Sequence, residues 1–356
     1  VSGVLSARFP SSYRSILTKL TDLVAVYPDC FQTSLIRSNT RKDSVMEAIN
    51  SPVASVIEGM FKESWVNETK EGIPREWLEN IEKFTDDGGN LYRYALVICN
   101  RNLGWFYARE TKWTEKYLLS AICSDDEETI QAFWSGFFGS GKVHGPELFR
   151  VLKNPMLKFA HQNELGQKGY GKVMVSNILA GWTSTDEETN SPYISNKELR
   201  ELLVRTDDDF RSQVLWRIKF LCSKDEDGSW LERLNVLLQD VWPKQISAKS
   251  PSTTKKLCDL AFTNEKIFSK VSHLIQPLLV KVNNEHNSIP HLGRRNEKII
   301  ENHPEKVLSI LHVVLSNDSR RWPYHVNDVF IGIEQADSNL RYDERLIELK
   351  RKWNSR

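Results

Sequence analysis

The stretch DDDFRSQVLWRIKFLC, residues 207–222, shows the pattern that decides the fold class of this chain. Its apolar side chains recur every three or four residues, at Phe210, Val214, Ile218, Leu221 and Cys222. In a helix this spacing places them in one stripe over roughly three to four turns. Three aspartates precede the stripe, where carboxylates favour the positive end of a helix. The stretch is therefore predicted to form an amphipathic helix.

The same period returns along most of the chain. Further stripes are Trp230, Leu234, Leu237 and Val241; Ile267, Val271, Leu274 and Leu278; and Val307, Leu308, Leu311, Val314 and Leu315. The best strand candidate, residues 95–99, lies inside a helix-compatible stretch from 90 to 108, which we expect to be helical. Ser-x-x-Glu capping boxes predict helix starts at Ser44, Ser124, Ser195 and Ser229. Together these signals predict about fifteen helices with short connections.

The predicted fold class is all-α, an irregular α-solenoid of stacked helix pairs that resemble degenerate HEAT repeats. The capping boxes at Ser195 and Ser229 are spaced as helix pairs would be. Residues 183–195, TSTDEETNSPYIS, form a polar seam. We therefore predict an N-terminal helical region, 1–183, and a C-terminal helical-repeat region, 184–356. Two compact helical bundles joined at this seam are the alternative.

Composition narrows the class of protein. The chain has 356 residues, with 48 Lys and Arg against 47 Asp and Glu, and a net charge of +1. This balance argues against a polybasic nucleic-acid coat. No apolar run approaches the ~18 residues of a membrane span, and no signal peptide is recognisable. The five cysteines form no C-x-x-C pair, so we expect core residues in a reducing cytoplasm. The start at Val1, without methionine, suggests a fragment of a longer protein.

One glycine-rich segment resembles a phosphate-binding loop. Residues 136–143, GFFGSGKV, match G-x-x-x-x-G-K, but Val143 replaces the hydroxyl residue that would hold Mg²⁺. The residues before it read as a helix, whereas such a loop follows a buried strand. We interpret the segment as a turn between helices, and a P-loop-like NTPase using Lys142 as an alternative. The acidic clusters precede apolar stripes and the eight histidines lack zinc spacing, so we expect no catalytic residue, metal or cofactor.

Basic residues interleaved with aromatic ones are the candidates for an interaction site. They occur in the segment 320–325, in the connector at 294–295, and between 341 and 356, where the sequence has six basic and three acidic residues. Such clusters contact phosphates or an acidic partner. The predicted contact residues are Arg294, Arg295, Arg320, Arg321, Trp322 and Tyr324.

A family resemblance covers roughly residues 229–356. The residues that carry it are Val241-Trp242-Pro243-Lys244, Ser250-Pro251, Leu257-Cys258-Asp259-Leu260-Ala261-Phe262, Leu278-Leu279, His303-Pro304-Glu305, Arg321-Trp322-Pro323 and Asp343-Glu344-Arg345-Leu346-Ile347-Glu348-Leu349. In this order they resemble the uncharacterised helical C-terminal region of large bacterial antiphage-defence proteins. Some of those proteins carry an N-terminal sirtuin-like domain that cleaves NAD, and no such cofactor motif is present here.

The resemblance implies a non-catalytic sensor or regulatory scaffold. Such a scaffold would bind a phage component or a partner subunit and control an effector domain outside this chain. The alternatives are a nucleic-acid-binding helical module, which would use the same basic residues on phosphates, and the NTPase. The sequence does not name the ligand, the effector domain, the oligomeric state or the role of the N-terminal half.

Overall fold

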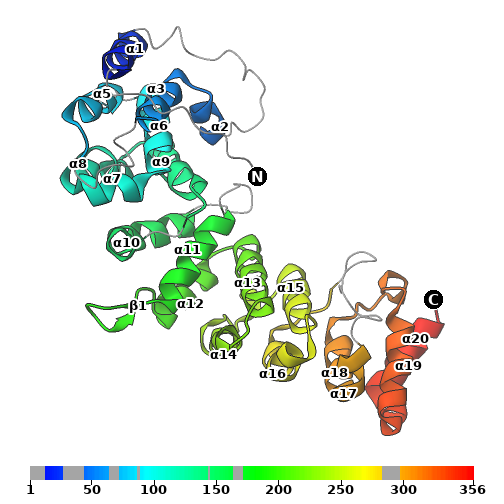
Figure 1. Ribbon diagram of the computed structural model, residues 1–356. Coiled ribbons are helices and arrows are strands. Elements are labelled where there is room, and N and C mark those ends of the chain that lie inside the picture. Colours follow the sequence, from blue (N-terminus) through cyan, green and yellow to red (C-terminus); the bar gives the residue numbers. More distant parts are fainter. Residues whose placement is uncertain are drawn as a thin grey trace. The chain divides into compact units, whose positions relative to one another are not determined.

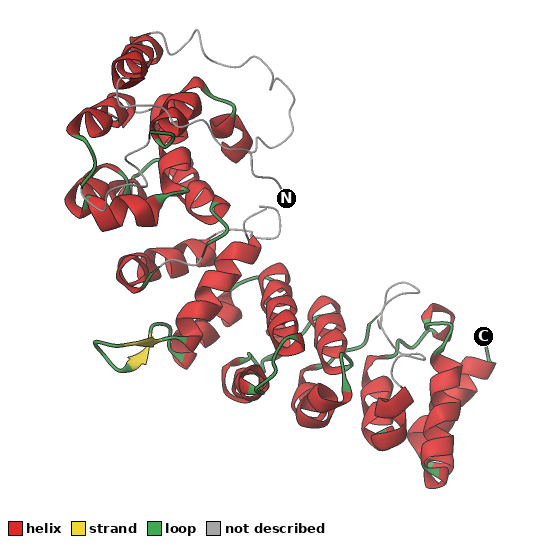
Figure 2. Ribbon diagram, viewed as in Figure 1, coloured by secondary structure: helices red, strands yellow, loops and turns green. Residues whose placement is uncertain are grey.

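The computed structural model describes residues 13–26, 44–63, 72–85, 89–142, 145–162, 171–282 and 297–356. Most of these residues are helical, and a two-stranded antiparallel hairpin forms the sheet (Figure 2). The all-α prediction is therefore confirmed. The chain divides into two compact units, Val1–Pro155 and Met156–Arg356. The division falls inside α10 (Pro146–Gln162) rather than at the seam near residue 183.

The first unit is built around α6 (Gly89–Asn100), whose residues 95–100 are all buried. It packs against α2 (Ser44–Ile49), α3 (Pro52–Met60), α5 (Arg75–Thr85) and α9 (Glu127–Gly139). The strand candidate 95–99 is thus helical, as expected. The helix does not continue to residue 108, because a turn at 101–102 separates it from α7 (Leu103–Arg109). The short helices α8 (Thr111–Tyr117) and η3 (Leu119–Cys123) then lead to α9.

A buried carboxylate fastens α1 (Arg14–Val26) to this unit. The Glu63 side chain is fully buried, accepts a hydrogen bond from Trp77 Nε1 at 3.0 Å, and pairs with Arg14 Nε at 2.8 Å. Both carboxylate oxygens therefore have a donor, which a buried charge requires. The three side chains come from α1, from the turn after α3 and from α5, so these contacts join helices that are distant in sequence.

The second unit consists of helices that follow one another along the chain (Figure 1). Its helices are α11 (Gly171–Thr183), α12 (Asn196–Arg205), α13 (Asp208–Ser223), α14 (Ser229–Val236), α15 (Pro251–Ala261), α16 (Glu265–Ile275), α17 (Glu297–Asn302), α18 (Pro304–Val314), α19 (Val326–Ala336) and α20 (Glu344–Asn354). Shorter turns of helix are η5 (Leu237–Val241), η6 (Ile246–Ala248), η7 (Gln276–Leu278), η9 (Ser319–Arg321) and η10 (Ser338–Tyr342). Along this series α13 contacts α11 and α15, α14 contacts α16, and α18 contacts α16 and α20.

The polar seam at 183–195 lies within the second unit. It contains the strands β1 (Thr185–Asp186) and β2 (Ser191–Pro192), which pair antiparallel between α11 and α12. Asn190 has a φ of 49°, and Asn tolerates this left-handed conformation better than most residues. The polar composition that suggested a boundary therefore reflects a small hairpin.

The helix starts agree with the sequence in part. Ser195 and Glu198 form the expected capping box of α12. The box at Ser124 is wrong, because Asp126 caps α9 with its side chain and Ser124 lies two residues earlier. The box at Ser229 is also wrong, because this residue is the first of α14 and Gly228 precedes it with a φ of 84°. At Ser44, side-chain contacts lie outside the described residues.

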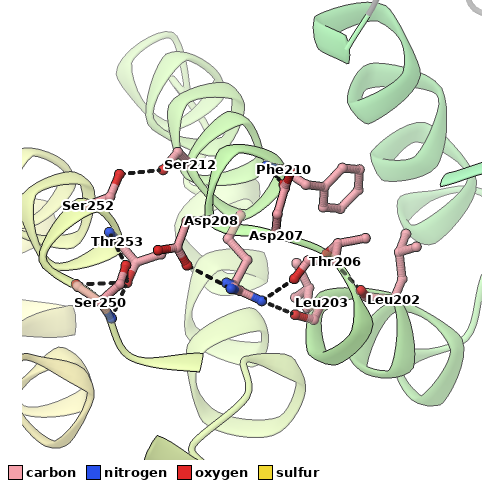
Figure 3. Close-up of polar contacts among 11 residues, drawn as sticks. Leu202, Leu203, Thr206, Asp207, Asp208, Phe210, Ser212, Ser250, Ser252 and Thr253 are labelled. Atoms are coloured by element: carbon pink, nitrogen blue, oxygen red, sulfur yellow. Dashed lines mark hydrogen bonds and ion pairs between the residues drawn. The ribbon is translucent and has the colours of Figure 1, made fainter. Parts of the chain in front are cut away.

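A buried arginine joins α12 to α13, and the next residue, Ser212, has its hydroxyl 3.5 Å from that of Ser252 in α15 (Figure 3). Arg211 Nη1 donates to the carbonyl oxygens of Leu203 at 2.9 Å and Thr206 at 2.5 Å, and Nη2 pairs with Asp208 at 2.7 Å. Carbonyls at the end of a helix lack partners within it, so the guanidinium satisfies those of α12. This contact fixes the turn between the two helices.

Candidate interaction surface

The basic-aromatic segment at 318–325 connects α18 to α19. Asp318 is the first residue of this segment. Its side chain accepts a hydrogen bond from the backbone nitrogen of Arg320 at 3.1 Å and so caps the start of the short helix η9. This local bond turns the chain so that both arginines lie on the exposed side of the connection. An Asp side chain commonly forms such a turn.

One carboxylate faces two guanidinium groups here. Asp318 Oδ1 accepts from Arg320 Nε at 3.0 Å and Oδ2 accepts from Arg320 Nη2 at 3.3 Å, while Arg321 Nε lies 3.5 Å from the same Oδ2. The side-chain hydrogen bond from Arg320 is the main cause that lowers the pKa of Asp318. Two exposed guanidinium groups therefore share this carboxylate.

Trp322 lies in the core, so the prediction that it contacts a partner is corrected. Its side chain is 2% exposed, and Nε1 donates to the carbonyl oxygen of Ser316 at 2.9 Å. The ring meets Phe330 of α19 edge to face, with centroids 6.4 Å apart. A buried tryptophan usually satisfies its N–H in this way. The residue therefore supports the turn from beneath.

Arg356 brings the end of the chain to the same turn. Its Nε donates to the carbonyl oxygen of Ser319 at 2.7 Å, and its Nη2 donates to that of Trp322 at 2.9 Å. Its guanidinium also lies over the ring of Trp353, 3.5 Å from the ring centroid. The third arginine of the surface is therefore held by backbone carbonyls and keeps its charge without a carboxylate at hydrogen-bond distance among the described residues.

We call Arg320, Arg321, Tyr324 and Arg356 the C-terminal basic surface. Tyr324 is 77% exposed, and the three arginines are exposed as well. The surface thus combines three guanidinium groups and one aromatic ring around Asp318. Arginine and tyrosine are enriched among residues that contribute most to protein interfaces.

Other basic residues near the end of the chain are paired within the fold. Arg345 pairs with Asp343 at 2.7 Å, Lys350 with Glu334 at 2.8 Å and Lys352 with Glu348 at 2.5 Å. Lys352, and after it His312, lower the pKa of Glu348 to about 2. Three of the six basic residues between 341 and 356 are therefore paired with carboxylates, while Arg341, Arg351 and Arg356 are exposed.

Two further candidates from the sequence are the arginines at 294–295 and the glycine-rich segment 136–143. Arg294 and Arg295 lie outside the described residues. Gly136 and Gly139 lie inside α9, and Gly141 follows with a φ of 66°. The segment before Lys142 is therefore a helix and its end, as the sequence interpretation held. A phosphate-binding loop requires a strand at that place.

Within the described ranges, no group of three or more His, Cys, Asp or Glu side chains is arranged to hold a metal ion. In the same ranges, no helix is long and apolar enough to cross a bilayer. A small hollow lies under the C-terminal basic surface, lined by Val282, Leu315, Ser316, Arg321 and Trp322 among others. Its walls are mostly those of the core beneath the turn.

Sequence reasoning missed Asp318 and Arg356. The first had a local signal, because an Asp side chain commonly accepts a hydrogen bond from the backbone nitrogen two residues later. The second had none, since 37 residues separate Arg356 from Ser319. The residues of the family resemblance are mainly structural: Trp242, Leu257, Phe262, Leu278 and Leu346 are all buried.

Comparison of the chain with family models, with curated proteins and with solved structures gives no match.

Proposed function

We propose that this chain is a non-catalytic binding scaffold that recognises a protein partner through the C-terminal basic surface. The observation that carries the proposal is the shared carboxylate of Asp318. It faces two exposed arginines, while carbonyls hold a third arginine beside them. An acidic surface of a partner would carry the complementary negative charges. Complementary charges of this kind favour specific and rapid association.

The helical pairs of the second unit support the same proposal. We regard them as an irregular, HEAT-like solenoid, because each pair contacts the pairs before and after it in the sequence. In such a stack, neighbouring repeats support one another, and the ends of the helices form an extended binding surface. The C-terminal basic surface would then lie at the last repeats, where α18, α19 and α20 meet.

The family resemblance gives the proposal its biological setting. It supports the proposal that the chain is part of a cytoplasmic bacterial antiphage-defence protein, in which this region would sense a phage component or a partner subunit. Partner binding would shift the population of conformers and so control an effector domain elsewhere. The support for this setting comes from the motifs between residues 241 and 349.

The test begins with the immobilised chain and lysates of phage-infected and uninfected bacteria. We expect a protein to be retained by the wild-type chain and depleted when Arg320→Ala and Arg321→Ala are combined. The control combines Lys197→Ala and Lys244→Ala, which removes two exposed positive charges elsewhere in the second unit. Nuclease treatment separates protein capture from capture through nucleic acid. Equal retention by both double variants, or retention lost after nuclease treatment, would contradict the proposal.

A further inference from the structure

A second exposed cluster lies on α13, away from the C-terminal basic surface. Trp216 and Phe220 are 40% and 37% exposed, although residues of this size are usually buried. They are four residues apart, so they share one face of the helix. Their rings are nearly parallel, with an interplanar angle of 16° and centroids 6.2 Å apart. The helix buries Phe210, Val214 and Ile218 on another face.

Three cations surround these rings. Lys172 Nζ of α11 lies 5.2 Å from the ring centroid of Trp216. The guanidinium of Arg217 and Nζ of Lys224 lie 5.4 Å and 4.5 Å from that of Phe220. These distances are within the range of cation–π attraction. We call these five residues the α13 aromatic face.

The cations of this face have no carboxylate at ion-pair distance within the part of the chain that the structure describes. Lys219 of the same helix shows the contrast, because it pairs with Asp259 at 2.7 Å. Among the described residues, the carboxylates of the acidic loop after α13 form no ion pair with the cations of this face. Its Asp225 accepts from the backbone nitrogen of Leu231 at 3.0 Å, and Asp227 accepts from that of Ser229 at 2.9 Å. Both carboxylates thus serve the start of α14.

We propose that the α13 aromatic face binds single-stranded nucleic acid. Bases would stack on Trp216 and Phe220, and Lys172, Arg217 and Lys224 would move from the rings to the phosphates. Aromatic rings beside unpaired cations are what sequence-tolerant binding of single strands uses. An acidic peptide would need the cations but not two parallel exposed rings, so the arrangement favours nucleic acid.

The size of the face limits the strength of binding. Residues 216–224 span about 12 Å of helix, enough for two or three nucleotides. With a net charge of +1, the chain as a whole adds little attraction. We therefore expect micromolar affinity at low salt. Contact with three phosphates predicts a slope of about −2 in a plot of log affinity against log salt concentration.

The experiment measures fluorescence anisotropy of labelled dT20 with the full chain at 50 and 200 mM NaCl. Trp216→Leu keeps apolar bulk but removes the aromatic plane, and we expect affinity to fall roughly 5- to 100-fold. Trp216→Phe should restore most of it. Combined Lys172→Gln, Arg217→Gln and Lys224→Gln should abolish the salt dependence together with binding. The control combines Lys197→Gln, Lys244→Gln and Lys306→Gln, three exposed lysines outside the face.

Selective loss of dT20 binding in the face variants, with unchanged melting temperatures, supports the proposal. Three results would overturn it. One is no binding of dT20 at 50 mM NaCl. Another is an equal affinity for a 20-base-pair duplex, which cannot stack its bases on the rings. The last is equal binding of polyglutamate that Trp216→Leu leaves unchanged, since this would make the face a site for acidic protein segments.

Discussion

At Gly136 the helices α6 and α9 approach so closely that no side chain fits. A Cβ atom there would lie 2.4 Å from the carbonyl oxygen and 2.8 Å from the Cα of Val97. Because both atoms belong to the backbone of α6, one helix would have to move. The glycine of the apparent phosphate-binding motif is thus explained by helix packing.

Gly136→Ala should therefore destabilise the first unit by roughly 1–3 kcal/mol, the usual cost of overpacking a core. Gly139→Ala is the matched control in the same helix. A Cβ there would meet just Val45 at 4.0 Å, and alanine favours a helix over glycine. Urea unfolding followed by tryptophan fluorescence measures both. An unchanged stability for Gly136→Ala, with loss of Mg²⁺-dependent ATP binding, would revive the NTPase alternative.

The side chain of Asp126 caps the start of α9 in the same unit, and the stability that it contributes depends on pH. Its carboxylate accepts from the backbone nitrogens of Glu128 and Thr129, and Arg93 Nη2 lies 2.9 Å away. The hydrogen bond from the Thr129 side chain is the main cause that lowers the pKa of Asp126 to about 2. An unfolded Asp titrates near ~3.9, so the charged cap stabilises the fold above pH ~4. This contribution is lost as the pH falls from about 4 towards 2.

Asp126→Ala should accordingly cost about 1 kcal/mol at pH 7, a typical value for a lost N-cap. The difference from the wild type should shrink when the urea titration is repeated at pH 3 and approach its minimum near pH 2. Asp126→Asn retains a capping oxygen and should lose less at pH 7. A difference that is constant between pH 7 and pH 2 would show that the charge of Asp126 does not contribute.

At the scale of the helices, periodicity identified the elements and local capping located part of their starts. The stripe at Val307, Leu308, Leu311 and Val314 is buried on α18, as the spacing indicates. Ser195 caps its helix because both partners of the box are local. The roles of Gly136 and Arg356 could not be predicted from periodicity or from capping patterns. Their roles depend on Val97, Ser319 and Trp322, which are distant in sequence and meet them through tertiary packing.

Leu311→Ala tests whether the helix pairs act as a stack. Leu311 is fully buried, so the truncation should cost roughly 2–5 kcal/mol. In a repeat stack the loss spreads to neighbouring pairs first. Hydrogen exchange should therefore rise in α16 to α20 and remain unchanged in α11 to α13. Ile347→Ala, at a side chain that is 50% exposed, is the control and should have a small effect. A uniform rise across the second unit would indicate one compact bundle.

On the whole molecule, the net charge is close to zero, although positive side chains gather at particular places. The net charge is +1, and many described cations are paired with carboxylates, as Lys350 and Lys352 are. The C-terminal basic surface differs from this background, because two exposed arginines share Asp318 and backbone carbonyls hold Arg356 beside them. Exposed ion pairs contribute little to stability, so these charges have little structural value there. We propose that they contact an acidic partner.

The most direct test is the affinity of the captured partner for two forms of the purified chain. Titration calorimetry compares the wild type with the combined Arg320→Ala and Arg321→Ala variant at 150 mM salt. We expect an affinity at least about ten-fold lower for the variant, as is usual when residues central to an interface are truncated. Its melting temperature should match that of the wild type, because both side chains are exposed. Equal affinity in the two forms would contradict the claim.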